Sequence, residues 1–172
     1  NPTKAVRTSG IINAAYRGVQ DANTCIRYFK KTYAENSNIY GIDTSRISIW
    51  GQCTGGYIAI NCSALDDYVK IPTATNGKFL LSIPPNIIPM IIPAANGDVE
   101  GKTVGVTPPG FGALWGVPDG DTLCYPNHVA YSSDFHLGVN IGGAIGDSAW
   151  IDPGQKPLIS IQTTNDPFAP YK

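Results

Sequence analysis

The chain has 172 residues, of which 42% are hydrophobic, so it is long enough to form one domain around a single core. Its formal net charge is −1 and 15% of its residues are charged, against a usual fraction of about 25%. The absence of a basic cluster excludes an electrostatic nucleic-acid-binding protein, and five interruptions by proline or asparagine in the apolar segment 79–93 exclude a transmembrane helix.

Apolar residues recur at intervals of three and four in the first part of the chain, which predicts an α-helix over residues 10–36. The predicted apolar face consists of Ala15, Val19, Ala22, Ile26, Phe29 and Tyr33. The opposite face carries polar residues, namely Arg17, Gln20, Asp21, Arg27, Lys30 and Lys31. The Asn-Ser-Asn run at 36–38 ends this helix, and residues 40–46 form the turn before the next element.

A short apolar run over residues 47–50 breaks at glycine and restarts as a helix-like run over residues 54–68. Cys53 stands at the break, with Gly51 and Gly55 two residues to either side, and Gly56 lets the helix pack closely. A strand, a tight turn and an immediate helix form a nucleophile elbow, which presents one reactive side chain above the end of a sheet. Because a helix N-terminus favours a thiolate, Cys53 is the candidate nucleophile.

The order of these segments resembles the α/β-hydrolase superfamily. The resemblance is carried by Arg17-x-x-x-Asp21 in the long helix, by the run Tyr-Gly-Ile-Asp-x-x-Arg-Ile at 40–47, and by the elbow at Cys53. It is most similar to the esterase branch, with its carboxylesterase-like and dienelactone-hydrolase-like members. The elbow residue is usually serine, but dienelactone hydrolase uses cysteine. The resemblance implies an α/β fold with a parallel sheet flanked by helices, and residues 1–172 as a single partial domain.

Turn signals replace helical periodicity between residues 70 and 136, where Pro-Pro, Asn-Gly and Pro-Asp-Gly sequences separate short apolar pieces. We interpret this segment as a loop-rich insertion within the domain. In the family such an insertion is commonly a cap over the site, and Phe111, Trp115 and Tyr125 would then line an apolar cleft. The alternative is that these aromatic residues pack the insertion onto the sheet.

Two further apolar runs predict strands at 137–142 and 157–162. We expect these strands and the strand at 47–50 to lie side by side and parallel, with both helices on one face. The loop that follows, Thr-x-x-Asp-Pro at 163–167, is similar to the acid-bearing loop of the hydrolases, which implies that Asp166 is the acid that orients a histidine. Asp147 is an alternative acid, and Asp166 could instead cap a turn before Pro167.

The histidine of the family follows the acid in the chain, whereas His128 and His136 both precede Asp166 and match no family position. The glycine-rich oxyanion loop of the family is also missing, so the backbone N–H of Thr54 is the one oxyanion donor implied. The chain begins without an initiator Met or a signal peptide. We therefore expect a partial product, in which further polypeptide supplies the histidine and covers the edge of the sheet.

Two functions remain open from the sequence. The first is a hydrolase of carboxylic esters or related acyl bonds, acting without a cofactor on a small-molecule substrate with an uncharged acyl group. The second is a non-catalytic binding or assembly module with the α/β-hydrolase fold, in which Cys53 is a buried relic or a disulfide partner. Cys124 and His128 lack the further ligands of a zinc site. Cys25 and Cys62 form a disulfide or stay free, and we expect an extracellular or periplasmic location.

Overall fold

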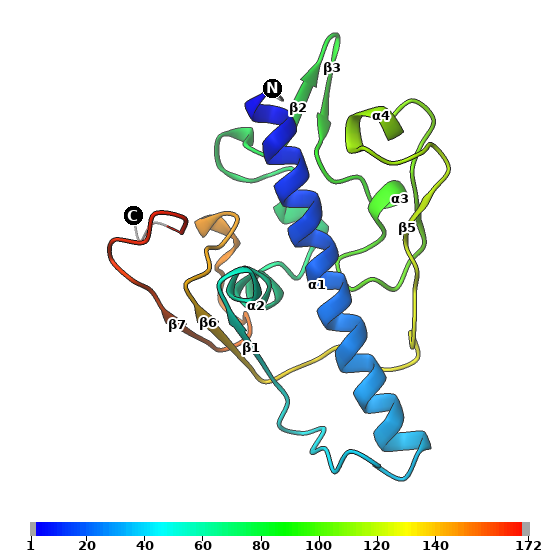
Figure 1. Ribbon diagram of the computed structural model, residues 1–172, viewed down its shortest axis with the longest axis vertical. Helices are drawn as coiled ribbons and strands as arrows, with labels where there is room; N and C mark the ends of the chain where they lie inside the picture. Colours follow the sequence, from blue (N-terminus) through cyan, green and yellow to red (C-terminus); the bar gives the residue numbers. More distant parts are fainter. Residues whose placement is uncertain (1–2, 170–172) are drawn as a thin grey trace.

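Three strands form a parallel sheet at one side of the molecule in the computed structural model, which describes residues 3–169 (Figure 1). They are β1 (Ser48–Gln52), β6 (Leu137–Ile141) and β7 (Leu158–Ile161), in the order β1-β6-β7. Both pairings are parallel, and Trp50 of β1 is aligned with Val139 of β6, which is aligned with Ile159 of β7. The predicted parallel arrangement of these strands is confirmed.

Helix α2 (Thr54–Ala64) follows β1 directly and packs on one face of the sheet. The helix lies close to the central strand because Gly138 has no side chain: a Cβ there would lie 2.2 Å from Oγ of Ser63. The helix is shorter than predicted. Asp67 accepts a hydrogen bond from the N–H of Val69 and starts a separate 3-10 turn over Tyr68–Lys70, so the helix does not continue to residue 68.

Helix α1 (Lys4–Glu35) is the longest element and lies between α2 and the insertion (Figure 1). The hydroxyl of Thr3 caps its first turn by accepting a hydrogen bond from the N–H of Val6. The prediction that both helices pack on the sheet is correct for α2, whereas α1 packs mainly on α2. The predicted faces of α1 also need correction, because Gln20 and Arg27 are buried and Tyr33 is 49% exposed.

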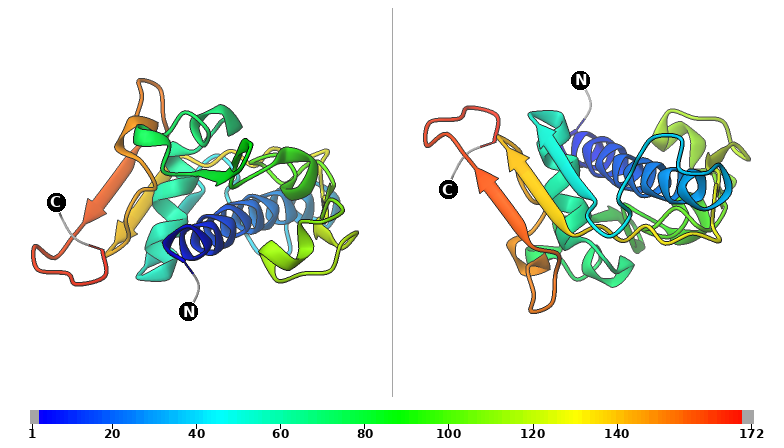
Figure 2. Two further views of the ribbon diagram at one scale, coloured as in Figure 1. Left: turned by 90° about the horizontal axis from the view of Figure 1, so that it is seen from above. Right: turned by 90° about the horizontal axis from the view of Figure 1, so that it is seen from below.

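The insertion contains only short elements. It has an antiparallel hairpin of β2 (Leu80–Ile83) and β3 (Asn86–Pro89). A second antiparallel pair consists of β4 (Gly105–Val106) and β5 (Thr122–Cys124). Two short helices, α3 (Pro93–Asn96) and α4 (Gly112–Trp115), alternate with these strands. Most of it lies on the side of α1 that faces away from the sheet (Figure 2). It therefore packs on α1 rather than onto the sheet.

A row of polar side chains on α1 attaches the insertion, at sequence intervals of three, four, three and four. They donate hydrogen bonds to backbone carbonyls, with nitrogen–oxygen or oxygen–oxygen distances between 2.6 and 3.3 Å. We call this row the polar stripe of α1; it consists of Asn13, Tyr16, Gln20, Asn23 and Arg27. The stripe satisfies carbonyls of a buried, irregular segment that has few strand or helix partners of its own.

The second face of the sheet is open to solvent. Trp50 is 72% exposed, Ile159 is 50% exposed and Ile161 is 57% exposed, and all three side chains project from the face opposite α2. Parallel sheets are almost always covered on both faces. Residues 3–169 thus form a mixed α/β fold in which α2 covers one face of the sheet and the other face is bare.

No helix among the described residues combines the length and the apolar character that a membrane span requires.

Candidate functional site at the carboxyl edge of the sheet

Cys53 lies at the junction of β1 and α2 in a backbone conformation that L-residues rarely adopt, with φ 54° and ψ −121°. Such a conformation costs on the order of 1–3 kcal/mol and persists only where the surrounding structure enforces it. Its N–H donates to the carbonyl of Ile141 at the end of β6, with a nitrogen–oxygen distance of 2.9 Å. The strand, strained turn and helix predicted around Cys53 are therefore present, and its side chain is exposed.

Close contacts explain two of the three glycines around Cys53. A Cβ on Gly51 would lie 1.8 Å from the carbonyl oxygen of Gly55, and a Cβ on Gly56 would lie 2.5 Å from Oδ1 of Asn140. No atom lies within 4 Å of a Cβ built on Gly55. The turn thus requires glycine before the cysteine and at the close contact with β6, but not at the position two residues after the cysteine.

Thr54 is the first residue of α2 and is exposed beside Cys53. The first N–H groups of a helix have no partner within the helix, and they carry the positive end of its dipole. This position is consistent with the expected role of the Thr54 N–H as a donor to a developing oxyanion.

Asp166 lies in the loop after β7, at the same edge of the sheet as Cys53. Its Oδ1 accepts hydrogen bonds from the N–H groups of Phe168 and Ala169, at 2.8 and 3.0 Å. The hydrogen bond from Ala169, followed by that from Phe168, lowers the pKa of Asp166. The carboxylate therefore caps a turn, as one alternative predicted, and the residue is half-buried at this edge.

Tyr57 connects the two predicted residues, although the sequence did not mark it as a site residue. It lies one helical turn after Cys53, and its hydroxyl donates to the carbonyl oxygen of Phe168 in the Asp166 loop at 3.1 Å. Burial, followed by the charges of Asp166 and Cys53, raises the pKa of Tyr57. Its position four residues after the elbow cysteine is the one sequence signal that could have identified it.

Asp147, the alternative acid, is buried and fully engaged. Its carboxylate accepts hydrogen bonds from the N–H and hydroxyl of Thr75 and from the N–H of Ala149, and it forms an ion pair with Lys78 at 3.0 Å. Burial favours the neutral acid, but these hydrogen bonds and Lys78 outweigh it and lower the pKa of Asp147 to about 2. The side chain holds the insertion to the loop after β6, which leaves Asp166 as the more accessible acid.

Both histidines lie away from Cys53. The N–H of His136 donates to the carbonyl of Ile47 at 2.8 Å, which places His136 at the amino end of the strands. Cys53 is six positions after Ile47 along extended chain, a span of roughly 20 Å. His128 packs against Tyr28 of α1, with 5.6 Å between the ring centroids and the rings tilted by 51°. Among residues 3–169, neither histidine reaches the carboxyl edge.

The aromatic residues predicted to line a cleft are in separate places. Trp115 packs against Phe111, with 5.2 Å between ring centroids, and lines a cavity whose opposite wall is the first part of α1. Tyr125 is 71% exposed and borders a different hollow beside Gln20. The walls of these two cavities do not include Cys53.

All four cysteines are free thiols, so the Cys25–Cys62 disulfide is not formed. Cys25 is exposed, whereas Cys62 is buried, and burial raises the pKa of Cys62 to about 12. Burial also raises the pKa of Cys124. Residues 3–169 contain no group of three or more His, Cys, Asp or Glu residues arranged to hold a metal ion.

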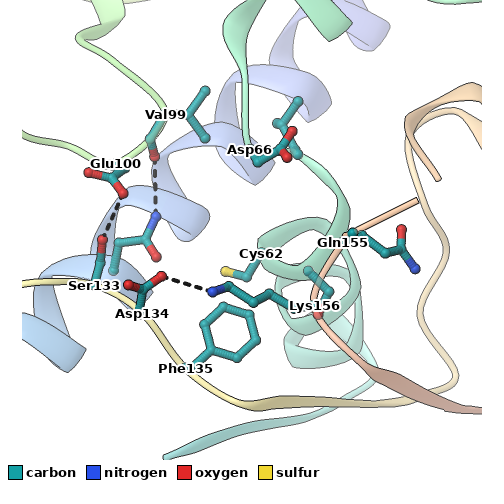
Figure 3. A pocket seen from close by; sticks show the side chains of 13 residues that line it. Cys62, Asp66, Val99, Glu100, Ser133, Asp134, Phe135, Gln155 and Lys156 are labelled. Atoms are coloured by element: carbon teal, nitrogen blue, oxygen red, sulfur yellow. Dashed lines mark hydrogen bonds and ion pairs between the residues drawn. The ribbon is translucent and has the colours of Figure 1, made fainter. Parts of the chain in front are cut away.

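A polar cavity of about 270 Å³ lies at the opposite, amino edge of the sheet (Figure 3). Its walls include Cys62, Glu100, Ser133 and Lys156. Ser133 donates to the carboxylate of Glu100, and Lys156 pairs with Asp134. Because these residues come from four distant segments, no local sequence pattern could have predicted the cavity.

No protein-family model matches this chain, and the comparisons with curated proteins and with solved structures find no match. The functional assignment therefore rests on the residues and on the geometry of the edge that contains Cys53, Tyr57 and Asp166.

Proposed function

We propose that this chain carries the nucleophile of a hydrolase that cleaves carboxylic esters or related acyl bonds, within an α/β-hydrolase-like core. The observation that carries the proposal is the strained backbone of Cys53, whose exposed thiol stands at the start of α2. Strain of this kind concentrates at functional sites. A buried structural cysteine would need neither the strain nor the exposure.

In the proposed reaction the Cys53 thiolate adds to the acyl carbon, and the alkoxide or thiolate leaving group departs with a proton. Water then adds to the thioester, which releases the carboxylic acid and returns the free thiol. The Thr54 N–H stabilises the oxyanion in both steps. Asp166 orients the histidine that transfers these protons, and further polypeptide supplies that histidine, because His128 and His136 lie elsewhere.

We also propose that this further polypeptide completes the sheet. Within the described residues β1 pairs only with β6, so its other edge has free backbone groups, and the face with Trp50 and Ile161 is bare. Both surfaces are of the kind that α/β proteins cover with another strand and with helices.

Limited alkylation tests the nucleophile. Brief treatment with substoichiometric iodoacetamide, followed by peptide mapping, should label Cys53 more than Cys25, the other exposed cysteine, and leave the buried Cys62 and Cys124 almost unlabelled. Acetylation by p-nitrophenyl acetate should occur at the same residue and be lost in Cys53→Ala but not in Cys25→Ala. Labelling of Cys53 that is equal to or lower than that of Cys25 would overturn the proposal.

The second candidate is a non-catalytic binding or assembly module, and the distance of both histidines from Cys53 favours it. Added imidazole separates the two. If Cys53 is a nucleophile that lacks its histidine, imidazole should accelerate hydrolysis of the acetyl group on Cys53. The wild-type chain with imidazole should then hydrolyse p-nitrophenyl acetate faster than Cys53→Ala with imidazole. An acetyl-Cys53 that imidazole does not release more quickly would favour the binding module.

A further inference from the structure

An apolar groove of about 200 Å³ lies between the first half of α1 and the first turns of α2. Cys53 is not part of its wall, but Tyr57, four residues after Cys53, is. Six apolar side chains form most of its walls: Ile11, Ile12, Ala15, Tyr57, Phe79 and Ile145. We call it the α1–α2 groove. The N-terminal half of α1 lies on the same side of the molecule as the carboxyl ends of the strands (Figure 2).

Two features place the groove near the elbow. Tyr57, in its wall, lies in the first turns of α2, and its N–H donates to the carbonyl of Cys53 at 3.2 Å. Asn61, one helical turn after Tyr57, is also in the wall. The loop that closes the groove begins after Gly143, where a Cβ would lie 2.2 Å from the nitrogen of Tyr57. The groove therefore begins within about one helical turn of the elbow.

Two of the polar side chains in the wall, Lys78 and Asn61, are already paired with protein atoms, and the third is the uncharged hydroxyl of Thr8. The ammonium of Lys78 donates to the carbonyl of Gly146 and pairs with Asp147. The amide of Asn61 donates to the carbonyl of Tyr57 and accepts from the N–H of Gly146. A group that enters the groove consequently meets hydrocarbon and aromatic surface, which favours an uncharged apolar occupant.

The size of the groove limits that occupant. An apolar cavity of about 150 Å³ accepts benzene, and a group the size of a water molecule occupies roughly 30 Å³ in a liquid. A groove of about 200 Å³ therefore holds a chain of about four to seven carbon atoms. This range fits a short fatty acyl group and is too small for a long-chain lipid tail.

We propose that the α1–α2 groove receives the acyl chain of the substrate, and that the site takes esters or thioesters of uncharged acyl groups with about four to seven carbon atoms. This inference rests on the proposed function of Cys53 and names the substrate class of that site.

A series of alkyl methanethiosulfonates, from methyl to decyl, tests the groove without requiring turnover. In each reaction the thiolate displaces methanesulfinate and forms a mixed disulfide that places the alkyl chain on sulfur. Peptide mapping gives the rate at Cys53 relative to Cys25, which is exposed on α1 and serves as the reference within the same molecule. This ratio should rise by up to about fourfold per methylene, the factor for burial of one CH₂, and level off near heptyl. A ratio independent of chain length overturns the inference.

Variants of the groove provide the second comparison. Ala15→Phe should fill the groove and flatten the dependence on chain length, while the reaction with the methyl reagent is retained. Ile11→Ser, at a side chain that is 69% exposed, is the milder variant if Ala15→Phe does not give a native circular dichroism spectrum. Ile39→Ser, 63% exposed in the turn after α1, is the matched control and should retain the wild-type dependence. Retention of that dependence in a folded groove variant also overturns the inference.

Hydrolysis of p-nitrophenyl esters of two to ten carbons separates this inference from the proposed function. If labelling of Cys53 depends on alkyl chain length but imidazole produces no turnover of the esters, the result supports the groove as an acyl site and overturns the hydrolase proposal. Turnover at Cys53 with equal rates for acetate, hexanoate and decanoate supports the hydrolase and overturns the groove.

Discussion

The residues around Cys53 have unequal steric roles, although the sequence motif is symmetric. Gly51 is required because a side chain there would meet the backbone of Gly55, whereas Gly55 itself faces open space. The motif predicted the turn correctly because the close contacts are local and involve residues four apart in sequence. It did not reveal which of the two flanking glycines matters.

Alanine substitutions at the two flanking glycines should separate these roles. Gly51→Ala should lower the free energy of unfolding by about 3 kcal/mol, because its Cβ overlaps backbone atoms that cannot move freely. Gly55→Ala should be neutral or raise it by up to about 1 kcal/mol, because alanine favours the helix. Urea denaturation of both variants measures the difference. Equal destabilisation would contradict the geometry of the turn.

Asp147 is a charged residue whose role is structural. Its pKa, about 2 in the folded protein, lies below the value of about 3.9 in an unfolded chain. Its contribution to stability is therefore fully present above pH 4 and is lost as the pH falls through 2.

Replacement of Asp147 should alter acid unfolding. Asp147→Asn should lower the free energy of unfolding by about 2 kcal/mol at pH 7, and its loss of stability between pH 4 and 2 should be smaller than that of the wild type. Asp121→Asn, at an exposed carboxylate, is the control and should leave the pH profile unchanged. Urea denaturation at a series of pH values gives both curves, and an unchanged acid limb in Asp147→Asn would refute the assignment.

At the scale of elements, α1 differs most from its prediction. Helical periodicity correctly identified the helix and the burial of Val19 and Ile26. It could not predict the burial of Gln20 and Arg27, because their partners are carbonyls of a loop some 75 residues later whose path has no sequence pattern. Such polar residues are indistinguishable from a solvated helix face until the position of the loop is known.

Arg27 should be the most sensitive position of the polar stripe. Its guanidinium is fully buried and donates to the carbonyls of Glu100, Gly101 and Asn127. Arg27→Met leaves these carbonyls without that donor and should lower the free energy of unfolding by about 3 kcal/mol. Lys31→Met removes an exposed ion pair with Glu35 on the same helix and should change it by less than about 1 kcal/mol. Similar urea midpoints for the two variants would contradict this role.

At the scale of the whole molecule, one face of the sheet exposes apolar side chains, among them Trp50, Ile159 and Ile161. The parallel direction of the strands was predictable, because three apolar runs separated by crossovers favour parallel pairing. The exposure of that face was not, because an apolar run has the same sequence whether one or both faces of a strand are covered. The site shows the same limit: the sequence placed Cys53 and Asp166 on one edge but missed Tyr57 and the α1–α2 groove, which depend on how α1 packs.

The bare face should make the isolated chain associate. Sedimentation velocity should detect self-association that grows with protein concentration, and the dye ANS should bind. The double variant Trp50→Ser/Ile161→Thr should reduce both effects, because it removes two exposed apolar side chains from that face. Val104→Ser, 59% exposed in the insertion, is the control and should reduce neither. Unchanged association in the double variant would show that another surface is responsible.

The polar stripe of α1 has a consequence for how this protein can diversify. Most of the main-chain oxygens of the insertion that its side chains bind lie between residues 90 and 101, the other being that of Asn127, and every residue type supplies such an oxygen. Substitutions at exposed positions of that segment can therefore accumulate without loss of attachment, provided that the turns at Gly97 and Gly101 keep their positive φ. A randomised library should tolerate variety at the exposed Glu100 and reject it at Gln20 and Arg27. The helix thus forms a fixed frame on which the loop can evolve new surface chemistry.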